Sequence, residues 1–439
     1  MTNHEVEVLA IGAGPSNLAL AVAIEESGAE SLADGTLVLE QHPDVQWQRN
    51  LLLPFARSQV SFVKDLVTLR NPRSRFSFLS FLHARGRLDE FVNLGTFNPF
   101  RREISEYLQW VADNLDNVGV RYNSRVTGAT PRKAADGSVA GWRVTLADGD
   151  TVDTRDLVVG TGRDARIPEE FAGLPKDRVI HSSQYSTRIA QYPIDRPVRV
   201  VVIGAAQSAA EMFVSVHKDL PLSQPTLVHR SIGLMNYQTS KFVNELFFPS
   251  FVDEFHRSGP EARAQILDEV RLTNYAGLAA PFLDETYLML YEQKLTGSRR
   301  SAVRPMTEVL SAREEDGEVV LELRNRRTGL VERLGCDLVL LGTGYDPRMP
   351  AMVRTLAGRA GVEKIEVDRN YRVDLGEGAR AGLYLQGFNE ATHGISDSLL
   401  SVLAQRSHDI TTDLLARREA DSAAQRTAQR VANTPAGVR

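Results

Sequence analysis

The sequence predicts an α/β protein built from two similar units, each with a parallel sheet and covering helices. The prediction rests on a pattern that occurs twice: a buried apolar strand, a tight glycine turn and an apolar helix start. The two copies are Val6-Glu-Val-Leu-Ala-Ile-Gly-Ala-Gly-Pro-Ser-Asn and Val198-Arg-Val-Val-Val-Ile-Gly-Ala-Ala-Gln-Ser-Ala. A similar returning strand follows each copy, Asp156-Leu-Val-Val-Gly-Thr-Gly and Asp337-Leu-Val-Leu-Leu-Gly-Thr-Gly. This arrangement is typical of two Rossmann-like dinucleotide-binding domains in one chain.

The first unit has the stronger nucleotide motif. Gly12 and Gly14 let the backbone approach a pyrophosphate, and the following helix offers free N–H groups and the positive end of its dipole. Glu40, at the end of the second strand, is the expected partner of a ribose hydroxyl. It lies 28 positions after Gly12, where about 20 is usual, so residues 28–35 are interpreted as a surface insertion. Asn17 stands where the third glycine is expected, and a purely structural strand-turn-helix remains the alternative.

The second unit predicts NADPH rather than NADH. Gly204 keeps the first glycine of the turn, whereas alanines replace the others. After the expected strand at residues 226–229, the chain carries Arg230 and Ser231 instead of an acid. A guanidinium can bind a 2′-phosphate bidentately, whereas a carboxylate would repel it. An ordinary surface arginine is the alternative interpretation.

We expect the chain of 439 residues to divide into four parts. They are an FAD-binding domain at residues 1–185 and 346–418, an NADPH-binding domain at residues 186–235 and 297–345, a substrate-binding insertion at residues 236–296 and a mobile tail at residues 419–439. The insertion is mostly helical in character, and an insertion of this length is expected to determine specificity. The tail is rich in Ala, Arg and Gln and has little to bury.

Composition excludes several classes of function. The net charge of −5 and the scattered arginine pairs argue against a nucleic-acid surface. No apolar run reaches the roughly 18 residues that a membrane helix needs. Cys336 is the only cysteine, which excludes disulfides, a dithiol redox pair and a cysteine-built zinc site. We therefore expect a protein of the reducing cytoplasm, without a metal and with a small-molecule partner.

A loop after the second strand supplies the first candidates outside the nucleotide motifs. Residues 59–76 show neither helical nor strand periodicity and contain an Asn-Pro step. We expect an ordered loop over the first cofactor there, with Gln59 and Lys64 as candidate site residues. Residues 101–117 predict a packing helix, and the polar hairpin sequence that follows predicts a small accessory sheet.

Further candidates come from the insertion and from the C-terminal part of the chain. Asn244 and Asn274 lie in the insertion, although ordinary helix caps or turns would also explain them. Ser396 and Asp397 precede an apolar run at residues 399–415, so we expect them to cap a helix whose start faces the first cofactor.

Two nucleotide sites, one for a flavin and one for NADPH, describe an electron path from a hydride donor to the flavin. Disulfide reductases with this plan need a pair of cysteines, which this chain lacks. Oxygen is then the expected electron acceptor, and the resulting flavin peroxide can transfer one oxygen atom to a substrate.

Several motifs, in order along residues 6–406, resemble the flavin-dependent N-hydroxylating monooxygenases that act on ornithine or lysine in siderophore pathways. These motifs are Gly12-Ala-Gly-Pro-Ser-Asn, Gln59-Val-Ser-Phe-Val-Lys-Asp-Leu, Arg70-Asn-Pro, Phe76-Ser-Phe, Gln207-Ser-Ala, Asn244-Glu, Thr273-Asn-Tyr, Gly342-Thr-Gly-Tyr-Asp-Pro and Thr392-His-Gly-Ile-Ser. Two positions depart from the family pattern: Ala206 stands where a second glycine is common, and Gln48 where a histidine often follows the tryptophan.

The resemblance implies a role for each candidate. Lys64 and Asn274 would bind the substrate carboxylate and Asn244 its α-amine, while Gln59 and Asn274 would lie beside the reacting groups as catalytic residues. The residues expected to contact FAD or NADPH are Gly12, Gly14, Pro15, Asn17, Glu40, Trp47, Gln59, Gly204, Gln207, Ser208, Arg230, Ser231, Tyr345, His393, Ser396 and Leu399. No protein nucleophile is needed, because the neutral side-chain amine of the substrate attacks the peroxide.

The expected activity is NADPH- and O2-dependent hydroxylation of L-ornithine to N5-hydroxyornithine through a C4a-hydroperoxyflavin. L-lysine is the second candidate substrate and a diamine the third, since Lys64 has no carboxylate to pair with in a diamine. A Baeyer–Villiger or sulfide-oxidising flavin monooxygenase and a redox-sensing flavoprotein are the alternatives outside this class. We also expect a homo-oligomer, a dimer or a tetramer.

Overall fold

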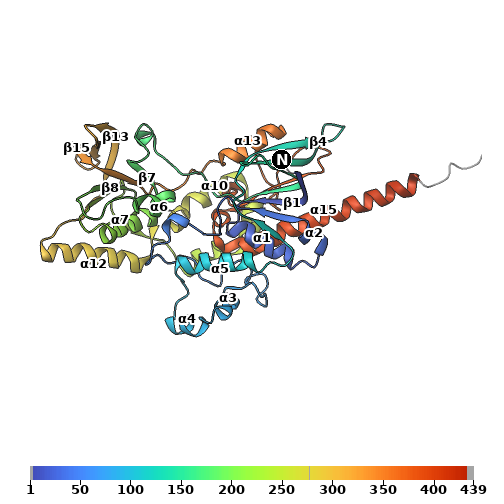
Figure 1. Ribbon diagram of the computed structural model, residues 1–439, viewed down its shortest axis with the longest axis horizontal. Coiled ribbons are helices and arrows are strands. Elements are labelled where there is room, and N and C mark those ends of the chain that lie inside the picture. The colour runs from blue at the N-terminus through green and yellow to red at the C-terminus, as the bar shows by residue number, and fades with distance from the viewer. Residues whose placement is uncertain (1–2, 276, 433–439) are drawn as a thin grey trace, which may run out of the picture.

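The computed structural model describes residues 3–275 and 277–432. Figure 1 shows two α/β bodies side by side, one around β1 and α1 and the other around β8 and α7. Each sheet contains the strand of one of the two predicted strand-turn-helix segments, so the predicted α/β fold class is confirmed.

The first sheet has the order β3-β2-β1-β6-β5-β4, and β17 also pairs with β6. Its strands are β1 (Asn3–Ile11), β2 (Thr36–Leu39), β3 (Gly119–Arg121), β4 (Val126–Lys133), β5 (Val139–Leu146), β6 (Thr151–Val159) and β17 (Gly382–Leu385). The first half of β6 pairs antiparallel with β5, while its second half pairs parallel with β17. The expected accessory sheet is therefore not separate, because β6 joins β4 and β5 to the nucleotide-binding sheet.

The helices around the first sheet bury two apolar clusters, one containing Leu18 and Leu414 and the other containing Val353 and Leu356. These helices are α1 (Pro15–Glu25), α2 (Glu30–Asp34), α3 (Phe78–Ala84), α4 (Leu88–Leu94), α5 (Arg101–Asp113), α13 (Ala351–Ala360), α14 (Glu390–His393) and α15 (Leu403–Ala432). The predicted packing helix is α5, and its apolar stripe is buried. Leu18 of α1 and Leu414 of α15 belong to the same core, so the C-terminal helix covers the helix that follows the first glycine turn. The predicted surface insertion at residues 28–35 contains the short helix α2.

The second sheet is entirely parallel, with the order β12-β9-β8-β16-β7. Its strands are β7 (Val179–His181), β8 (Arg199–Ile203), β9 (Gln224–Val228), β12 (Ala302–Arg304) and β16 (Leu338–Leu341). Helix α7 (Gln207–Asp219) packs on one face through Met212 and Phe213, next to α6 (Tyr185–Ile189). The antiparallel strands β13 (Thr307–Glu315), β14 (Glu318–Asn325) and β15 (Val331–Cys336) cover the other face.

One expected domain boundary differs from the structure. The sequence assigned residues 1–185 to the first domain, but β7 pairs with β16 of the second sheet. A strand of three residues is too short to show a period of two, so the sequence contained no signal for its pairing.

The insertion contains β10 (Met235–Asn236), β11 (Gly277–Leu278), α8 (Lys241–Asn244), α9 (Pro249–Arg257), α10 (Pro260–Glu269), α11 (Arg271–Asn274) and α12 (Ala280–Thr296). Phe247 and Val270 of this insertion pack on Ile395, which lies in the short 3-10 helix η5 (Ile395–Ser398). In contrast, α12 packs on the second core through Phe282 and Leu290. The insertion therefore bridges the two sheets.

Residues 419–432 continue α15 instead of forming the expected mobile tail. Alanine, arginine and glutamine are strong helix formers, which favours helix even where little surface is buried. Asp421 pairs with Arg155, and Arg418 pairs with Glu7 at 3.0 Å, so the first part of this segment is tied to the first sheet. In Figure 1 the end of α15 projects away from the body of the protein.

Candidate functional site

The first glycine turn presents bare backbone at the carboxyl edge of the first sheet. Gly12 has φ +92°, and a Cβ atom added to it would lie 3.2 Å from the carbonyl oxygen of Gly160. Gly14 precedes the helix as its N-cap, and Pro15 is the first helical residue. Proline at this position loses no intrahelical hydrogen bond. The free N–H groups of the first turn of α1 can therefore bind a pyrophosphate.

Glu40 directly follows β2 and lies beside this turn. Its carboxylate accepts the backbone N–H of Ala13 at 2.9 Å and that of His42 at 3.0 Å. The longer spacing from the glycine turn has therefore not displaced it from the position expected of a ribose-binding acid. These residues fit a dinucleotide in the first unit.

Asn17 occupies the third-glycine position and is fully buried. Its Nδ2 donates to the carbonyl oxygens of Ile11 and Gly12 at 2.9 and 2.8 Å. Its Oδ1 accepts from Gln386 at 2.8 Å, and Gln386 in turn accepts from Arg406 at 3.1 Å. The side chain of Asn17 is thus used within the protein to hold the turn, and its expected contact with the cofactor stays a prediction.

The segment around Ser396 departs from the expected helix cap. The carboxylate of Asp397 binds the fully buried guanidinium of Arg406 at 2.9 Å and accepts the N–H of Asn389 at 2.7 Å. Within the part of the chain that the structure describes, the buried Ser396 hydroxyl has no hydrogen-bond partner. Ser396 and Asp397 lie inside η5, and a second 3-10 turn (Leu400–Val402) separates them from α15, so the cap prediction is wrong. The unpaired Ser396 hydroxyl is available to a ligand.

Two other expected cofactor residues lie in the same segment. The ring of His393 is buried and stacks on Tyr371, with its nitrogens near Thr392 Oγ1 at 2.9 Å and Arg369 O at 3.2 Å. Burial lowers the pKa of His393 to about 4, so this imidazole is neutral at physiological pH. Leu399 packs beside the cluster that joins the insertion to η5. Their contacts with a cofactor stay predictions.

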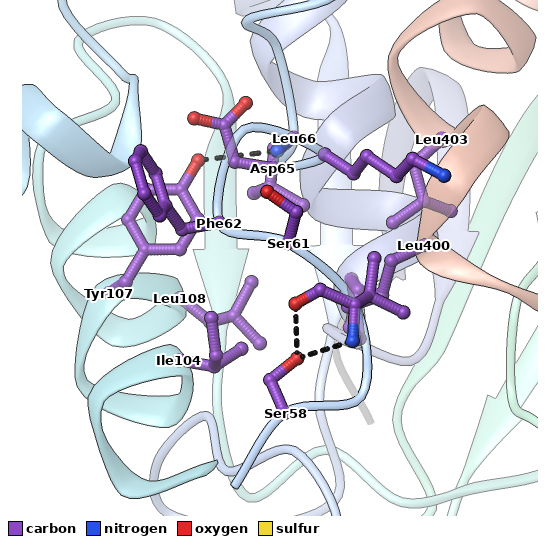
Figure 2. A pocket seen from close by; sticks show the side chains of 13 residues that line it. Ser58, Ser61, Phe62, Asp65, Leu66, Ile104, Tyr107, Leu108, Leu400 and Leu403 are labelled. Atoms are coloured by element: carbon purple, nitrogen blue, oxygen red, sulfur yellow. Dashed lines mark hydrogen bonds between the residues drawn. The ribbon is translucent and has the colours of Figure 1, made fainter. Parts of the chain in front are cut away.

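Lys64 lies on the predicted loop, and this loop is ordered by its neighbour Asp65. The buried Asp65 carboxylate accepts the N–H groups of Val67, Thr68 and Phe78 at 2.9, 2.6 and 2.8 Å. Figure 2 shows this loop lining a small cavity, together with Tyr107 from α5, Leu400 from the 3-10 turn before α15 and Leu403, the first residue of α15. Pro15 of the glycine turn and Lys64 line the same cavity. The structure therefore brings the loop to the first nucleotide motif.

The ammonium group of Lys64 has no carboxylate partner among residues 3–275 and 277–432. Its Nζ lies 3.4 Å from the hydroxyl of the buried Ser401 and 6.0 Å from the ring centroid of Phe247. Burial lowers the pKa of this half-buried lysine. An anionic ligand group would offset that desolvation, so Lys64 is suited to bind a carboxylate.

Asn244 and Asn274 end α8 and α11, respectively. Phe247, three residues after Asn244, is the ring that Lys64 approaches, while Val270 packs with Phe247 and Ile395. Neither asparagine side chain donates to or accepts from another described residue. Lys64 and the helices that end in Asn244 and Asn274 thus lie around the apolar cluster that contains Phe247, next to η5.

Tyr275 fixes the position of the residue before it, Asn274. Its phenol donates to Glu390 at 2.5 Å, and Glu390 pairs with Arg163 at 3.0 Å. Burial, followed by the negative charge of Glu390, raises the pKa of Tyr275. This contact anchors the end of α11 to the first nucleotide unit.

Gln59 has a partner that sequence reasoning missed. The phenol of Tyr237, just after β10, donates to Gln59 Oε1 at 2.9 Å. This bond leaves the amide donors of Gln59 free. Burial raises the pKa of Tyr237 to about 12, so it remains a donor throughout the neutral range. Only the expected helical character of the insertion was visible in the sequence, and no motif marked this tyrosine.

The second glycine turn is tighter than the first. Gly204 has φ +137°, and a Cβ atom there would collide with the carbonyl oxygen of Gly342. Ala206 is the N-cap of α7 in an extended conformation, which alanine adopts without strain, so this departure preserves the turn. Ser208 is the second residue of α7, where N–H groups are free. The turn fits a second dinucleotide.

Gln207, the first residue of α7, makes contacts within the protein. Its amide nitrogen donates to Glu211 at 2.9 Å, and its oxygen accepts the N–H of Ala279 at 3.2 Å. Beyond β9, Arg230 is exposed, while the Ser231 hydroxyl donates to Gly233 O at 3.0 Å and lies 2.9 Å from His229 Nδ1. Their expected contacts with NADPH stay predictions.

Trp47 and Tyr345 lie at the periphery of the two units. Trp47 packs against the first core, and its backbone is held by Ser105 at 3.1 and 3.2 Å. The following residue, Gln48, has φ 52°, a left-handed conformation that is uncommon for a non-glycine residue. Tyr345 is 45% exposed and meets His181 edge to face. The structure leaves the cofactor contacts of both aromatic residues as predictions.

The described residues offer neither a metal-binding cluster nor a membrane-spanning helix. No group of three His, Cys, Asp or Glu side chains there could hold a metal ion. None of the described helices has the length and apolar character needed to cross a membrane.

Comparison with known proteins places this geometry in context. The sequence matches the family described as L-lysine 6-monooxygenase/L-ornithine 5-monooxygenase over residues 4–347. The L-ornithine N(5)-monooxygenase of Burkholderia cepacia is 40% identical over 400 residues, which cover 88% of this chain and 89% of that protein. The structure of ornithine hydroxylase PvdA from Pseudomonas aeruginosa has a TM-score of 0.88 at 37% identity, covering 94% of this chain and 99% of that one. The ornithine N-hydroxylase KtzI of Kutzneria sp. 744, described with reduced FAD, NADP+ and L-ornithine, has a TM-score of 0.88 at 34% identity, covering 94% and 100%.

Proposed function

This chain belongs to the L-lysine 6-monooxygenase/L-ornithine 5-monooxygenase family, and from that premise we propose that it hydroxylates the side-chain amine of L-ornithine. The reaction uses FAD, NADPH and O2, and its product is N5-hydroxyornithine. The names of the relatives support this substrate, and the Kutzneria complex supports both cofactors. The two glycine turns of this chain fit two dinucleotides, as the sequence predicted.

The observation that supports an amino-acid substrate most directly is the unpaired ammonium of Lys64. It is half-buried, its pKa is lowered by burial, and it lies by Phe247 near the elements that bear Asn244 and Asn274. A cation in such a place favours an anionic ligand group. An α-carboxylate meets this requirement, whereas a diamine would bring a second cation.

These positions suggest a separate role for the cofactor and for each site residue. FAD, when bound, supplies the oxygen chemistry. Lys64 binds the carboxylate of the substrate, and the free amides of Asn244 and Asn274 bind its α-amine and carboxylate. Gln59, oriented by Tyr237, presents amide donors on the flavin side.

The side-chain amine of the substrate must be neutral in order to attack. A lysine-like amine has a pKa of about 10.4 in water, so most of it is charged at neutral pH. The apolar cluster of Phe247, Val270 and Ile395 provides a water-excluding surface, which disfavours the protonated form of the substrate amine. No side chain of this protein need act as a nucleophile.

A panel of amines tests the proposal. Hydroxylamine product is measured with L-ornithine, L-lysine, putrescine and cadaverine at equal concentrations, and we expect L-ornithine to give the highest kcat/KM. L-lysine is the alternative substrate within the family. Its side chain is one methylene longer, and the depth of the pocket determines which of the two chain lengths fits. A higher kcat/KM with either diamine would contradict the role of Lys64. Oxidation of a ketone or a thioether without hydroxylamine formation would indicate a Baeyer–Villiger or sulfide-oxidising enzyme instead.

Two further proposals concern the state of the protein in the cell. We propose a homo-oligomer, a dimer or a tetramer, which is supported by exposed apolar side chains along one face of α12: Tyr287, Leu288, Tyr291 and Leu295. Light scattering coupled to gel filtration measures its mass, and a monomer at micromolar concentration would contradict it. We also propose a cytoplasmic location, which is supported by the single, buried cysteine Cys336.

A further inference from the structure

Three arginines lie where the parallel strands β9 and β12 end. Arg230 follows β9 by two residues, Arg304 is the last residue of β12, and Arg326 follows β14. The chain segments are fastened together, because the N–H of His229 donates to Arg304 O at 3.2 Å and the N–H of Arg326 donates to Met306 O at 2.7 Å. In open α/β sheets, nucleotides bind beyond the carboxyl ends of the strands.

The three guanidinium groups differ in how far their charge is already paired. Arg304 donates to Glu332 at 2.5 Å. Arg230 has no ion pair in the described part of the chain. Arg326 approaches Glu308 only at 4.0 Å, and that carboxylate also contacts Arg324. Arg230 and Arg326 are therefore the two guanidinium groups available to an anion at this edge.

Arg326 is held next to Arg230. Its Nη1 donates to the backbone carbonyl oxygen of Arg230 at 3.1 Å. A guanidinium has five N–H donors in a rigid fork, so this bond leaves others free. Because the bond is made to the backbone of Arg230, it places the charge of Arg326 at the sheet edge whichever rotamer the Arg230 side chain adopts.

We propose that Arg326, together with Arg230, binds the 2′-phosphate of NADPH and is a second determinant of the preference for NADPH over NADH. The proposal rests on NADPH use by the β8-α7 unit. A phosphate dianion accepts hydrogen bonds from two guanidinium groups, whereas the ribose hydroxyl of NADH leaves two neighbouring cations without a counterion. The second arginine comes from the three-stranded sheet that covers the nucleotide unit, so this sheet takes part in cofactor selection.

Binding of nucleotide fragments to the FAD-loaded enzyme tests this without turnover. Calorimetry gives the Kd of adenosine 2′,5′-bisphosphate and of 5′-AMP for wild type and for Arg326→Ala, Arg326→Lys and Arg230→Ala. Arg327→Ala is the matched control, because it removes the same charge from the exposed neighbouring residue. Among the described residues, the Arg327 side chain has no hydrogen bond or ion pair, and its backbone N–H donates to Asn325 Oδ1. We expect Arg326→Ala to weaken the bisphosphate about tenfold, or about 1.4 kcal/mol, and to leave 5′-AMP unchanged.

The lysine variant and the kinetics sharpen the test. Arg326→Lys should fall between wild type and Arg326→Ala, because it keeps the charge but loses the fork. Flavin reduction measured without any amine should show the NADPH to NADH ratio of kcat/KM falling in Arg326→Ala and holding in Arg327→Ala. An unchanged Kd for the bisphosphate in Arg326→Ala, with normal flavin content, would overturn the proposal, as would an equal loss in Arg327→Ala. The fragment Kd values and the rates of flavin reduction are measured without an amine. They therefore remain valid tests even if the enzyme does not hydroxylate L-ornithine.

Discussion

Arg101 and Glu211 form a buried bidentate ion pair that joins the two nucleotide-binding units. Arg101 Nη1 and Nη2 donate to Glu211 Oε2 and Oε1 at 2.9 and 2.8 Å, and Nη1 also donates to Leu51 O at 2.6 Å. Arg101 is the first residue of α5, while Glu211 lies in the second turn of α7 and also accepts from Gln207. Both side chains are at most 5% exposed. This pair is thus one of the contacts that fix the relative position of the two units.

Removing one partner of this pair should destabilise the protein strongly. Glu211→Ala leaves the Arg101 guanidinium buried without a counterion, and we expect a loss of about 3–5 kcal/mol. The double variant Arg101→Met with Glu211→Leu should recover most of the loss, because apolar side chains of similar volume replace the pair. Thermal unfolding of the FAD-loaded protein measures both. A Glu211→Ala variant with the wild-type midpoint would show that the pair is not needed for stability.

Lys64→Ala should separate substrate binding from electron transfer. Without the ammonium group, the affinity for L-ornithine should fall about a hundredfold, or about 2.8 kcal/mol. The glycine turns are untouched, so NADPH should still reduce the flavin and oxygen should still be consumed, with release of hydrogen peroxide. Lys241→Ala is the control, since Lys241 is an exposed lysine of the insertion. Hydroxylated product and oxygen uptake are measured together. Wild-type apparent affinity in Lys64→Ala would show that another group binds the carboxylate.

The pH dependence of KM should report the lowered pKa of Lys64. Lys64 attracts the substrate carboxylate only while its own amine is protonated. Burial lowers the pKa of Lys64 below the ordinary 10.5. KM for L-ornithine should therefore rise as the pH passes upward through this lowered pKa, while kcat rises because more of the substrate amine is neutral. In Lys64→Arg the charge persists, so the rise in KM should disappear. Steady-state kinetics between about pH 7 and 10 measure both parameters. A flat KM for the wild type over this range would argue against an ion pair with Lys64.

Asn17 should not tolerate replacement by the glycine of the common motif. Asn17→Gly removes two hydrogen bonds to the turn and leaves the amide of the buried Gln386 without its acceptor. An unsatisfied buried polar group costs about 1–3 kcal/mol. We expect weaker FAD binding and a lower midpoint of thermal unfolding, measured by flavin content after gel filtration and by calorimetry. Asn93→Gly, at an exposed position of helix α4, is a control for the change in backbone freedom. Full flavin retention in Asn17→Gly would show that the turn holds its shape unaided.

Local sequence patterns determined much of this protein. Both strand-turn-helix units are predicted by short apolar runs and by glycines at positions where a side chain would not fit. These features involve only residues that are adjacent in the sequence. The packing helix α5 followed from an apolar stripe with a helical period. The motif around Lys64 predicted a site loop, and the structure brings that loop to the first glycine turn.

The tertiary structure alone decided which distant polar groups meet. Asn17 bonds to Gln386 across 369 positions, and Arg101 bonds to Glu211 across 110. Asp397 was expected to cap a helix, a role that its local sequence allows, yet it pairs with Arg406 instead. A short polar side chain has several acceptable partners, and which of them it meets depends on how remote elements pack. Backbone periodicity is a local property that the sequence displays directly, whereas a buried polar pair exists only once the fold has closed around it.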